Sequence, residues 1–384
     1  MTTRTLIGPH SILPPEPVAG VVKLAPAYNV LTSIALLKNN DQSADLGEWV
    51  VKTTAELEAK LTRQQMLVSW GIGLECLANA INLDSSELEF PAYLQALNSA
   101  DPIQLRDRIW HSMRFSSHMR VLLDGPNGPM PENLLQDRDA YVLFFAKEFN
   151  KLEKAFQPVP YETYQQTFDL LNDPPELQQL LASHLSELWQ THVAEEWGRI
   201  RPMLQDSVDA FQRVDFENLP IFEMVQKVTR RDVRAFFKEE ELLKFREIQF
   251  VPSVHNGPYI MWSGQEDVLR LTFSAYIPQG IPSRSASQLN QTELLNRLKA
   301  LADENRIMIL NALREDGELS TQEIMERFEL SKSAASRHLR QLGANSLIDE
   351  IRAEDGVKKF YRLNQEHGEK TLASLAGLLQ PLKE

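Results

Sequence analysis

Basic and small polar side chains recur at helical spacing near the carboxyl end of the chain, in residues 332–342. One side of the predicted helix is apolar, and the other carries Lys332, Ser333, Ser336, Arg337 and Arg340. A guanidinium group presents paired donors that match the two acceptors of a guanine edge, while Lys and Ser bind phosphate oxygens. This pattern predicts a helix that contacts DNA, with Arg337 suited to guanine.

His338 lies in the same segment, and its role stays open between two alternatives. The imidazole could contact a DNA phosphate, or it could pack against the core, since a lone helical histidine is often structural.

A second short helix is predicted just before this one. Ser320 and Glu323 form a capping box, which marks a helix start at Thr321, and the helix is expected to run to Phe328. Three residues, 329–331, then form a tight turn, and Ser331 is a suitable cap for the next helix. Two short helices joined in this way are typical of a helix-turn-helix.

Two strands, 347–352 and 358–363, are predicted after the helix-turn-helix, with Gly356 in the turn between them. Such a hairpin is a wing, and we expect its basic residues to approach backbone phosphates. These residues are Arg352, Lys358, Lys359 and Arg362. Amphipathic helices are expected on either side, over 291–302, 304–315 and 366–379.

The segments LKALADENRIMILNAL, LSKSAASRHLRQL and KKFYRL resemble the winged helix-turn-helix of ArsR-type bacterial transcription regulators, over about residues 288–380. The resemblance implies a double-stranded DNA operator and a homodimer paired through helices 291–301 and 366–379. It also implies repression that an inducer relieves. The preceding 280 residues resemble the large helical domain found on some of these regulators, whose effector, a small molecule or a protein, the resemblance does not supply.

Metal sensing by the family's known sites is not expected here. Metal-sensing relatives place a Cys-x-Cys pair near the first helix of the motif, whereas STQEIMERF has no cysteine. Relatives with a site on the last helix use Asp, His and Glu, and here only His367 stands near Glu366 and Glu369. We therefore expect no metal and no cofactor.

The predicted fold is mainly α, with residues 1–280 as a helical effector or interaction domain and 285–384 as the DNA-binding domain. A small antiparallel sheet is expected within 246–277, with Asn256-Gly257 as a hairpin turn, and strand 21–24 could join it. The Pro/Gly/Ser-rich stretch 277–288 is the expected boundary.

Helical patterning dominates the N-terminal part of the chain. Helices are predicted over residues 28–38, 46–70, 101–123, 132–156, 161–171, 176–211 and 230–244. Pro202 is expected to break or kink the longest of them.

The chain carries a net charge of -13, yet its basic residues are locally concentrated. Residues 1–284 hold 26 Lys and Arg against 37 Asp and Glu, whereas 332–362 hold seven against four. A screening length of about 8 Å lets such a local basic surface engage phosphates. One cysteine excludes an internal disulfide framework, and no apolar run is long enough for a membrane span or a secretion signal, so the expected location is cytoplasmic.

An enzyme is not expected, because no phosphate-binding glycine loop, nucleophile elbow or paired histidine ligands occur. Cys76 is expected to be buried and inert, and the segment His192-x-x-Glu195-Glu196 to be a solvated helix face. The alternative function is an N-terminal enzyme or protein-interaction scaffold that the C-terminal module tethers to DNA.

Overall fold

The computed structural model describes most of the 384 residues. The described ranges are 18–38, 46–78, 80–81, 85–115, 131, 133–150, 159–216, 219–234, 237–257, 259–265, 267–278, 281, 286–352 and 359–379. We call the part up to residue 278 the N-terminal region and the part from residue 286 the C-terminal region.

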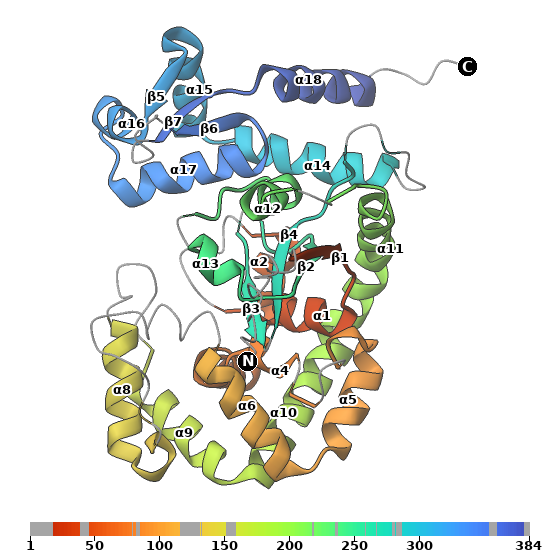
Figure 1. Cartoon of the computed structure of the whole chain (residues 1–384), viewed down its shortest axis with the longest axis vertical. Coiled ribbons are helices and arrows are strands. Elements are labelled where there is room, and N and C mark those ends of the chain that lie inside the picture. Colours follow the sequence, from red (N-terminus) through yellow and green to blue (C-terminus); the bar gives the residue numbers. More distant parts are fainter. Residues whose placement is uncertain are drawn as a thin grey trace, which may run out of the picture.

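Helices make up most of the N-terminal region (Figure 1). They are α1 (Pro26–Ala35), α2 (Glu48–Glu56), α3 (Ala59–Met66), α4 (Leu74–Leu77), α5 (Phe90–Ser99), α6 (Pro102–Phe115), α8 (Arg138–Asn150), α9 (Tyr161–Asn172), α10 (Pro174–Leu188), α11 (Ala194–Phe211), α12 (Ile221–Thr229) and α13 (Glu239–Leu242). Two described segments are π-helical. Leu67–Ile72 follows α3, and Trp189–Val193 lies between α10 and α11. The mainly α fold class is thereby confirmed.

Several predicted helix boundaries were wrong. The predicted helix 46–70 is divided at 57–58. Among the described residues of the predicted helix 230–244 only α13 is helical, and Arg230, in the left-handed conformation, ends α12 just before it. Pro202 lies inside α11 without ending it. Part of the predicted 101–123 and 132–156 helices lies outside the described residues.

The sheet of the N-terminal region has the order β1-β2-β4-β3 and is mostly parallel. Its strands are β1 (Ala19–Val22), β2 (Glu247–Ser253), β3 (Trp262–Gln265) and β4 (Val268–Ser274). The strand near residue 21 joins the sheet as expected, by parallel pairing with β2. The predicted all-antiparallel arrangement was wrong, since β2 also pairs with β4 in parallel and only β3 and β4 run antiparallel.

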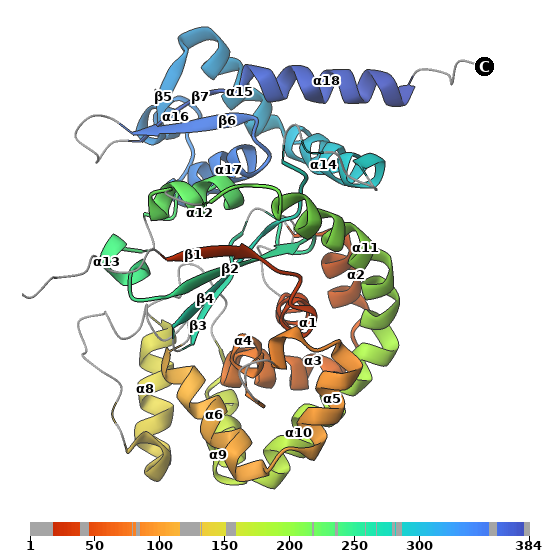
Figure 2. The ribbon, with the colours of Figure 1, turned by 45° about the vertical axis from the view of Figure 1, so that its right-hand side comes forward.

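The position of the sheet explains this pairing. Helices α1 and α12 lie on opposite sides of it (Figure 2), and β2 is buried along almost its whole length. Parallel strands are typically covered on both faces in this way. Asn256-Gly257 therefore turns the chain toward β3, which lies beyond β4, instead of closing a hairpin with β2.

The C-terminal region has two helices before its first strand, β5 (Glu318–Ser320), and three helices after it. In chain order its helices are α14 (Ala286–Leu301), α15 (Glu304–Asp316), α16 (Thr321–Arg327), α17 (Lys332–Ala344) and α18 (Gln365–Leu379). Strands β6 (Ile348–Arg352) and β7 (Lys359–Leu363) pair antiparallel, and β5 adds to the other edge of β7. The sequence did not predict β5.

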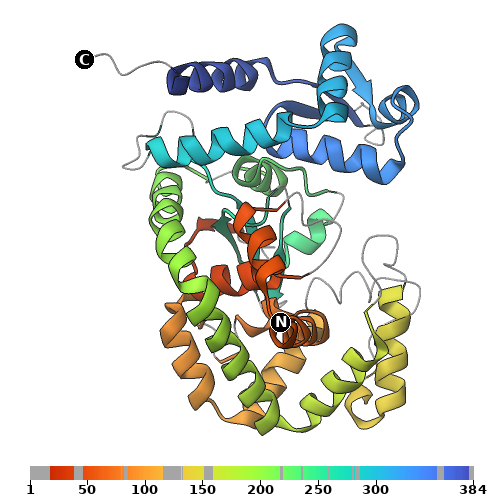
Figure 3. The same cartoon turned by 180° about the vertical axis from the view of Figure 1, so that it is seen from behind.

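Separate groups of buried apolar side chains support the two regions. One extends from Val22 to Tyr276 and includes Tyr28, Phe211 and Phe250. Another, from Ala300 to Tyr361, holds the C-terminal helices to their sheet. Seen from behind, α14 lies across the top of the N-terminal region and α18 lies above α14 (Figure 3). Among the described residues no helix is long and apolar enough to cross a membrane.

Candidate nucleic-acid interface

The first helix of the candidate interface, α16, begins as its capping box predicts. The Ser320 hydroxyl accepts a hydrogen bond from the Glu323 backbone N–H at 3.3 Å, and the Glu323 carboxylate accepts one from the Ser320 N–H at 2.7 Å. Both bonds satisfy backbone donors that a helix start leaves open. Ile324 is fully buried and holds α16 to the core.

A short turn sets the angle between α16 and α17. Glu329 adopts the left-handed conformation at φ 52°, and the Leu330 N–H donates to the Met325 carbonyl at 3.0 Å. The Ser331 hydroxyl then accepts from the Ala334 N–H at 3.2 Å and caps α17, as expected. The helix-turn-helix is therefore specified by local hydrogen bonds.

The inner face of α17 packs on the C-terminal core. Ala335, Leu339 and Leu342 are each at most 2% exposed. His338 is also buried, at 3% exposure, with its Nδ1 3.6 Å from Oδ1 of Asp303. Of the two alternatives for His338, this burial favours packing on the core.

The outer face of α17 is exposed to solvent in its first two turns and partly buried further on. Lys332, Ser333, Ser336 and Arg337 are exposed, which leaves their donors accessible to a ligand. Arg340, one turn further on, is half-buried. The first two turns thus form an open basic surface, and the later turns lie against the N-terminal region.

Two predicted residues lie on β7 of the wing, and Lys359 lines the same cleft as Ser336 and Arg340 of α17. The Lys359 ammonium lies 2.7 Å from the Glu350 carboxylate, and Arg362 is exposed and 3.7 Å from Asp349. These are partly exposed pairs that phosphate could replace at small cost. Arg352 lies on β6 opposite Lys359, and Lys358 lies outside the described residues.

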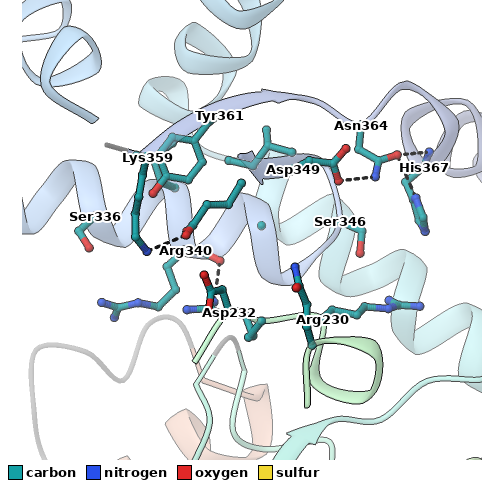
Figure 4. Close-up of a pocket in the computed structure, with 16 residues that line it drawn as sticks. Arg230, Asp232, Ser336, Arg340, Ser346, Asp349, Lys359, Tyr361, Asn364 and His367 are labelled. Carbon is teal, nitrogen blue, oxygen red and sulfur yellow. Dashed lines mark hydrogen bonds and ion pairs between the residues drawn. The ribbon is translucent and has the colours of Figure 1, made fainter. Parts of the chain in front are cut away.

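A cleft of about 600 Å³ separates α17 and the wing from the N-terminal region. Figure 4 shows Arg230 and Asp232 on its N-terminal side and Arg340, Lys359 and Tyr361 on the other. Arg231 Nη1 donates to the Arg340 carbonyl at 3.3 Å. The residues from the N-terminal region were missed by the sequence analysis, because nothing local marks a contact between positions so far apart in the chain.

The cleft holds both repulsive and attractive interactions of its arginine side chains. Burial, followed by the positive charge of Arg340, lowers the pKa of Arg231 to about 10, so its guanidinium stays charged at neutral pH. The Arg340 guanidinium lies 5.5 Å from the centre of the Tyr259 ring, a cation–π contact that offsets part of the repulsion.

Helices α14 and α18 leave an apolar surface uncovered. The side chains of Leu295, Leu372, Leu378 and Leu379 are 56%, 68%, 59% and 75% exposed. Inside this pair, Arg297 Nη1 donates to the Thr371 hydroxyl at 3.2 Å and joins the two helices.

A buried polar network lies within the N-terminal region. His255 Nε2 is 2.8 Å from a Glu196 oxygen, His255 Nδ1 is 2.9 Å from the Ser33 hydroxyl, and Trp49 stacks on the imidazole. Burial tends to raise the pKa of Glu196, but hydrogen bonds from His255 and Arg199 outweigh it and lower that pKa. Glu196 was predicted to be solvated and is instead 7% exposed. Ser33, Glu196 and His255 are all buried, so the network is suited to holding α1 and α11 to the β2–β3 connection.

The structure also places the cysteine and the C-terminal histidine that the sequence analysis considered. Cys76 is buried at 4% exposure, as expected of an inert thiol. His367 Nδ1 is 3.0 Å from the Asn364 side-chain oxygen at the start of α18. In the described part of the chain, no group of three or more His, Cys, Asp or Glu could hold a metal ion.

Comparisons with known proteins match the C-terminal region. Residues 303–349 match the family model described as bacterial regulatory protein, arsR family. The arsenical resistance operon repressor of Staphylococcus aureus is 36% identical over 76 residues, which are 20% of this chain and 70% of that protein. The transcriptional activator HlyU of Vibrio cholerae serotype O1 is 40% identical over 75 residues, 20% of this chain and 67% of that protein. The solved structure of reduced HlyU matches 24% of this chain and 97% of its own, at 33% identity and a TM-score of 0.20.

Proposed function

The chain belongs to the ArsR family of bacterial regulatory proteins, and from this premise we propose that it is a homodimeric transcriptional repressor that binds operator DNA through α17 and the wing. The observation that carries the proposal is the open basic face of Lys332, Ser333, Ser336 and Arg337, with Lys359 of the wing lining the same cleft as Ser336. Its side chains are those that bind base edges and phosphates. A DNA partner implies a cytoplasmic location.

Recognition helices enter the major groove with their first turns, and the exposed half of α17 is its amino-terminal half. We assign the base contact to Arg337, whose guanidinium can bind both acceptors of a guanine. Lys332, Ser333 and Ser336 are assigned to phosphate or base edges. Arg352, Lys358, Lys359 and Arg362 are assigned to the backbone at the wing.

The exposed leucines of α14 and α18 support the homodimer. An uncovered apolar surface on a helix pair is suited to an identical surface of a second copy, related by a two-fold axis. Two recognition helices would then enter successive major grooves about 34 Å apart.

The N-terminal region is proposed to be a separate domain that binds an effector or a partner. Its own apolar core supports this assignment. A coupling of about 1–3 kcal/mol between the effector and DNA would change operator affinity roughly 5- to 150-fold. Screening metabolites and candidate proteins for a ligand that raises the melting temperature and alters DNA affinity tests this part.

The DNA-binding function is tested by selecting bound fragments from random duplex DNA and titrating the recovered sequence in gel shifts. Arg337→Ala should weaken specific binding by about 1–3 kcal/mol, roughly 5- to 150-fold, and relax preference at one base pair. Arg314→Ala is the matched control, because Arg314 is exposed on α15 outside the helix-turn-helix and wing. Failure to recover any preferred sequence, or equal affinity of Arg337→Ala, would refute the assignment.

Whether binding represses is a separate question. A reporter gene placed behind the selected sequence should be expressed more strongly in cells that lack the protein. Lower expression in those cells would identify an activator.

A further inference from the structure

The N-terminal region contacts the same face of α17 that would face DNA. Arg340 belongs to this face by its spacing from Ser333, Ser336 and Arg337. In the structure, however, the Arg340 carbonyl accepts a hydrogen bond from Arg231, and the Arg340 guanidinium stacks over Tyr259. Helix α12, which precedes Arg231, lies directly below α17 (Figures 1 and 2).

A second group of residues brings the two regions together at α14 and at the end of α17. Lys299 on α14 is 3.5 Å from Glu48 on α2. A cleft of about 310 Å³ between the regions is lined by Gln341 and Ala344 of α17 and by Gly47 and Val254 of the N-terminal region. The two regions are thus close to each other along the last two turns of α17 and at α14, and their association does not depend on one side chain.

DNA and the N-terminal region cannot both occupy the space beside α17. The major groove is about 8.5 Å deep and 12 Å wide, and a helix with its side chains is about 10–12 Å across. A helix inside the groove has phosphates close to both of its flanks. With Arg231 3.3 Å from the Arg340 carbonyl, that flank is occupied by protein.

The contact also has an unfavourable electrostatic component. It brings the two guanidinium groups of Arg231 and Arg340 together, and their mutual repulsion contributes to the lowered pKa of Arg231. Glu350 on β6 offsets part of this repulsion. Phosphates would instead stabilise both the Arg340 guanidinium and the lysine of the wing.

On the basis of the proposed DNA-binding function, we infer that the surface formed by Arg231, Asp232 and Tyr259 is an inhibitory docking surface for the recognition helix, and that DNA and this surface bind α17 in competition. The protein binds its operator only after the two regions separate at this contact. An effector that acts on the N-terminal region would regulate DNA binding by shifting that equilibrium.

Hydrogen–deuterium exchange of the unaltered full chain tests the competition directly. The probe is a mixed-sequence duplex of about 30 base pairs, long enough for two half-sites one turn apart, at low ionic strength. On addition of DNA, residues 332–344 should exchange more slowly and residues 226–232 faster. If 332–344 are protected while 226–232 exchange at the same rate or more slowly, the inference is overturned and DNA binding still holds.

A variant gives the energetic test. Arg231→Ala should bind the duplex at least about fivefold more tightly, because the apparent dissociation constant is the intrinsic one divided by the fraction of molecules in the competent state, and this variant raises that fraction. Loss of a positive charge would by itself weaken DNA binding, so a gain is diagnostic. Arg201→Ala, which removes an arginine paired with Glu89 elsewhere on the surface, is the control and should bind as the unaltered chain does.

The outcomes separate the two claims. Equal or weaker binding by Arg231→Ala overturns the docking inference alone. Absence of binding by all three proteins overturns the DNA-binding function and the inference with it.

Discussion

The imidazole of His338 lies beneath the recognition helix, with its Nδ1 3.6 Å from Oδ1 of Asp303. Asp303 also caps α15 by accepting from the Arg306 N–H at 3.0 Å. One carboxylate therefore serves the start of α15 and faces the inner side of α17. This relationship brings the start of α15 next to the side of α17 that packs on the core.

His338→Ala should act on stability and not on phosphate binding. Removing a buried side chain from a packed helix typically costs about 0.5–3 kcal/mol in the free energy of unfolding. Thermal unfolding should show the loss, while the dependence of DNA affinity on salt concentration should keep its slope. A normal melting temperature with a slope reduced by about 0.9 would instead show that His338 contacts a phosphate.

The sequence predicted the helix-turn-helix accurately because its signals are local. Ser320 with Glu323, Ser331 and Asp303 each cap a helix within three residues, and the apolar spacing of α17 identifies its buried side. Such patterns operate over one helical turn, so they can be found without knowledge of the rest of the fold.

Pairings between distant segments could not be predicted in this way. Nothing in the strand at 247–253 specifies that its neighbours are β1 and β4 in parallel, since pairing depends on which faces the helices cover. The contact of Arg231 with Arg340 joins residues 109 apart, and that of Glu196 with His255 joins residues 59 apart. The choice between the two alternatives for His338 could not be made from the sequence for a related reason: its neighbour Asp303 lies 35 positions away in the chain.

Leu372→Lys on α18 should weaken the homodimer. Leu372 is 68% exposed in the single chain, and a dimer formed through α14 and α18 would bury it, so a charge there would lose water without gaining a partner. Sedimentation velocity should show a shift toward monomer, and cooperative operator binding should fall in parallel.

Leu143→Lys is the matched control for that substitution. Leu143 is 64% exposed on α8, remote from α14 and α18 (Figure 3), and its replacement should leave the oligomeric state unchanged. A dimer that persists in Leu372→Lys would locate the two-fold interface elsewhere.

Zn²⁺ and chelators should leave operator affinity unchanged. The chain has one cysteine, and it is buried among the apolar residues of the N-terminal region. Zinc sites in proteins take three or four ligands of Cys, His, Asp or Glu, and no cluster of three such residues that could hold a metal occurs in the described residues. Gel shifts with added Zn²⁺ and with EDTA check this, with Cys76→Ser as the control. Release of DNA by Zn²⁺ in the unaltered chain but not in Cys76→Ser would show that the thiol senses metal.

Folding stability should fall in mild acid because of His184. Its Nε2 is 2.9 Å from Gln65 Oε1, and its Nδ1 is buried with no hydrogen-bond partner among the described residues. Burial lowers its pKa from 6.5 to about 4. Between these values the unfolded chain binds a proton that the folded chain does not, so the free energy of unfolding decreases as pH falls below about 6.5. The expected loss from about pH 7 to about pH 5 is roughly 2 kcal/mol.

The variant His184→Gln tests this pH dependence. It keeps a donor toward Gln65 without a titrating ring, so urea titrations at both pH values should show a loss of unfolding free energy in acid that is smaller by that amount. Equal acid sensitivity of the two proteins would mean that other groups, with His255 as the first to examine, account for the pH dependence.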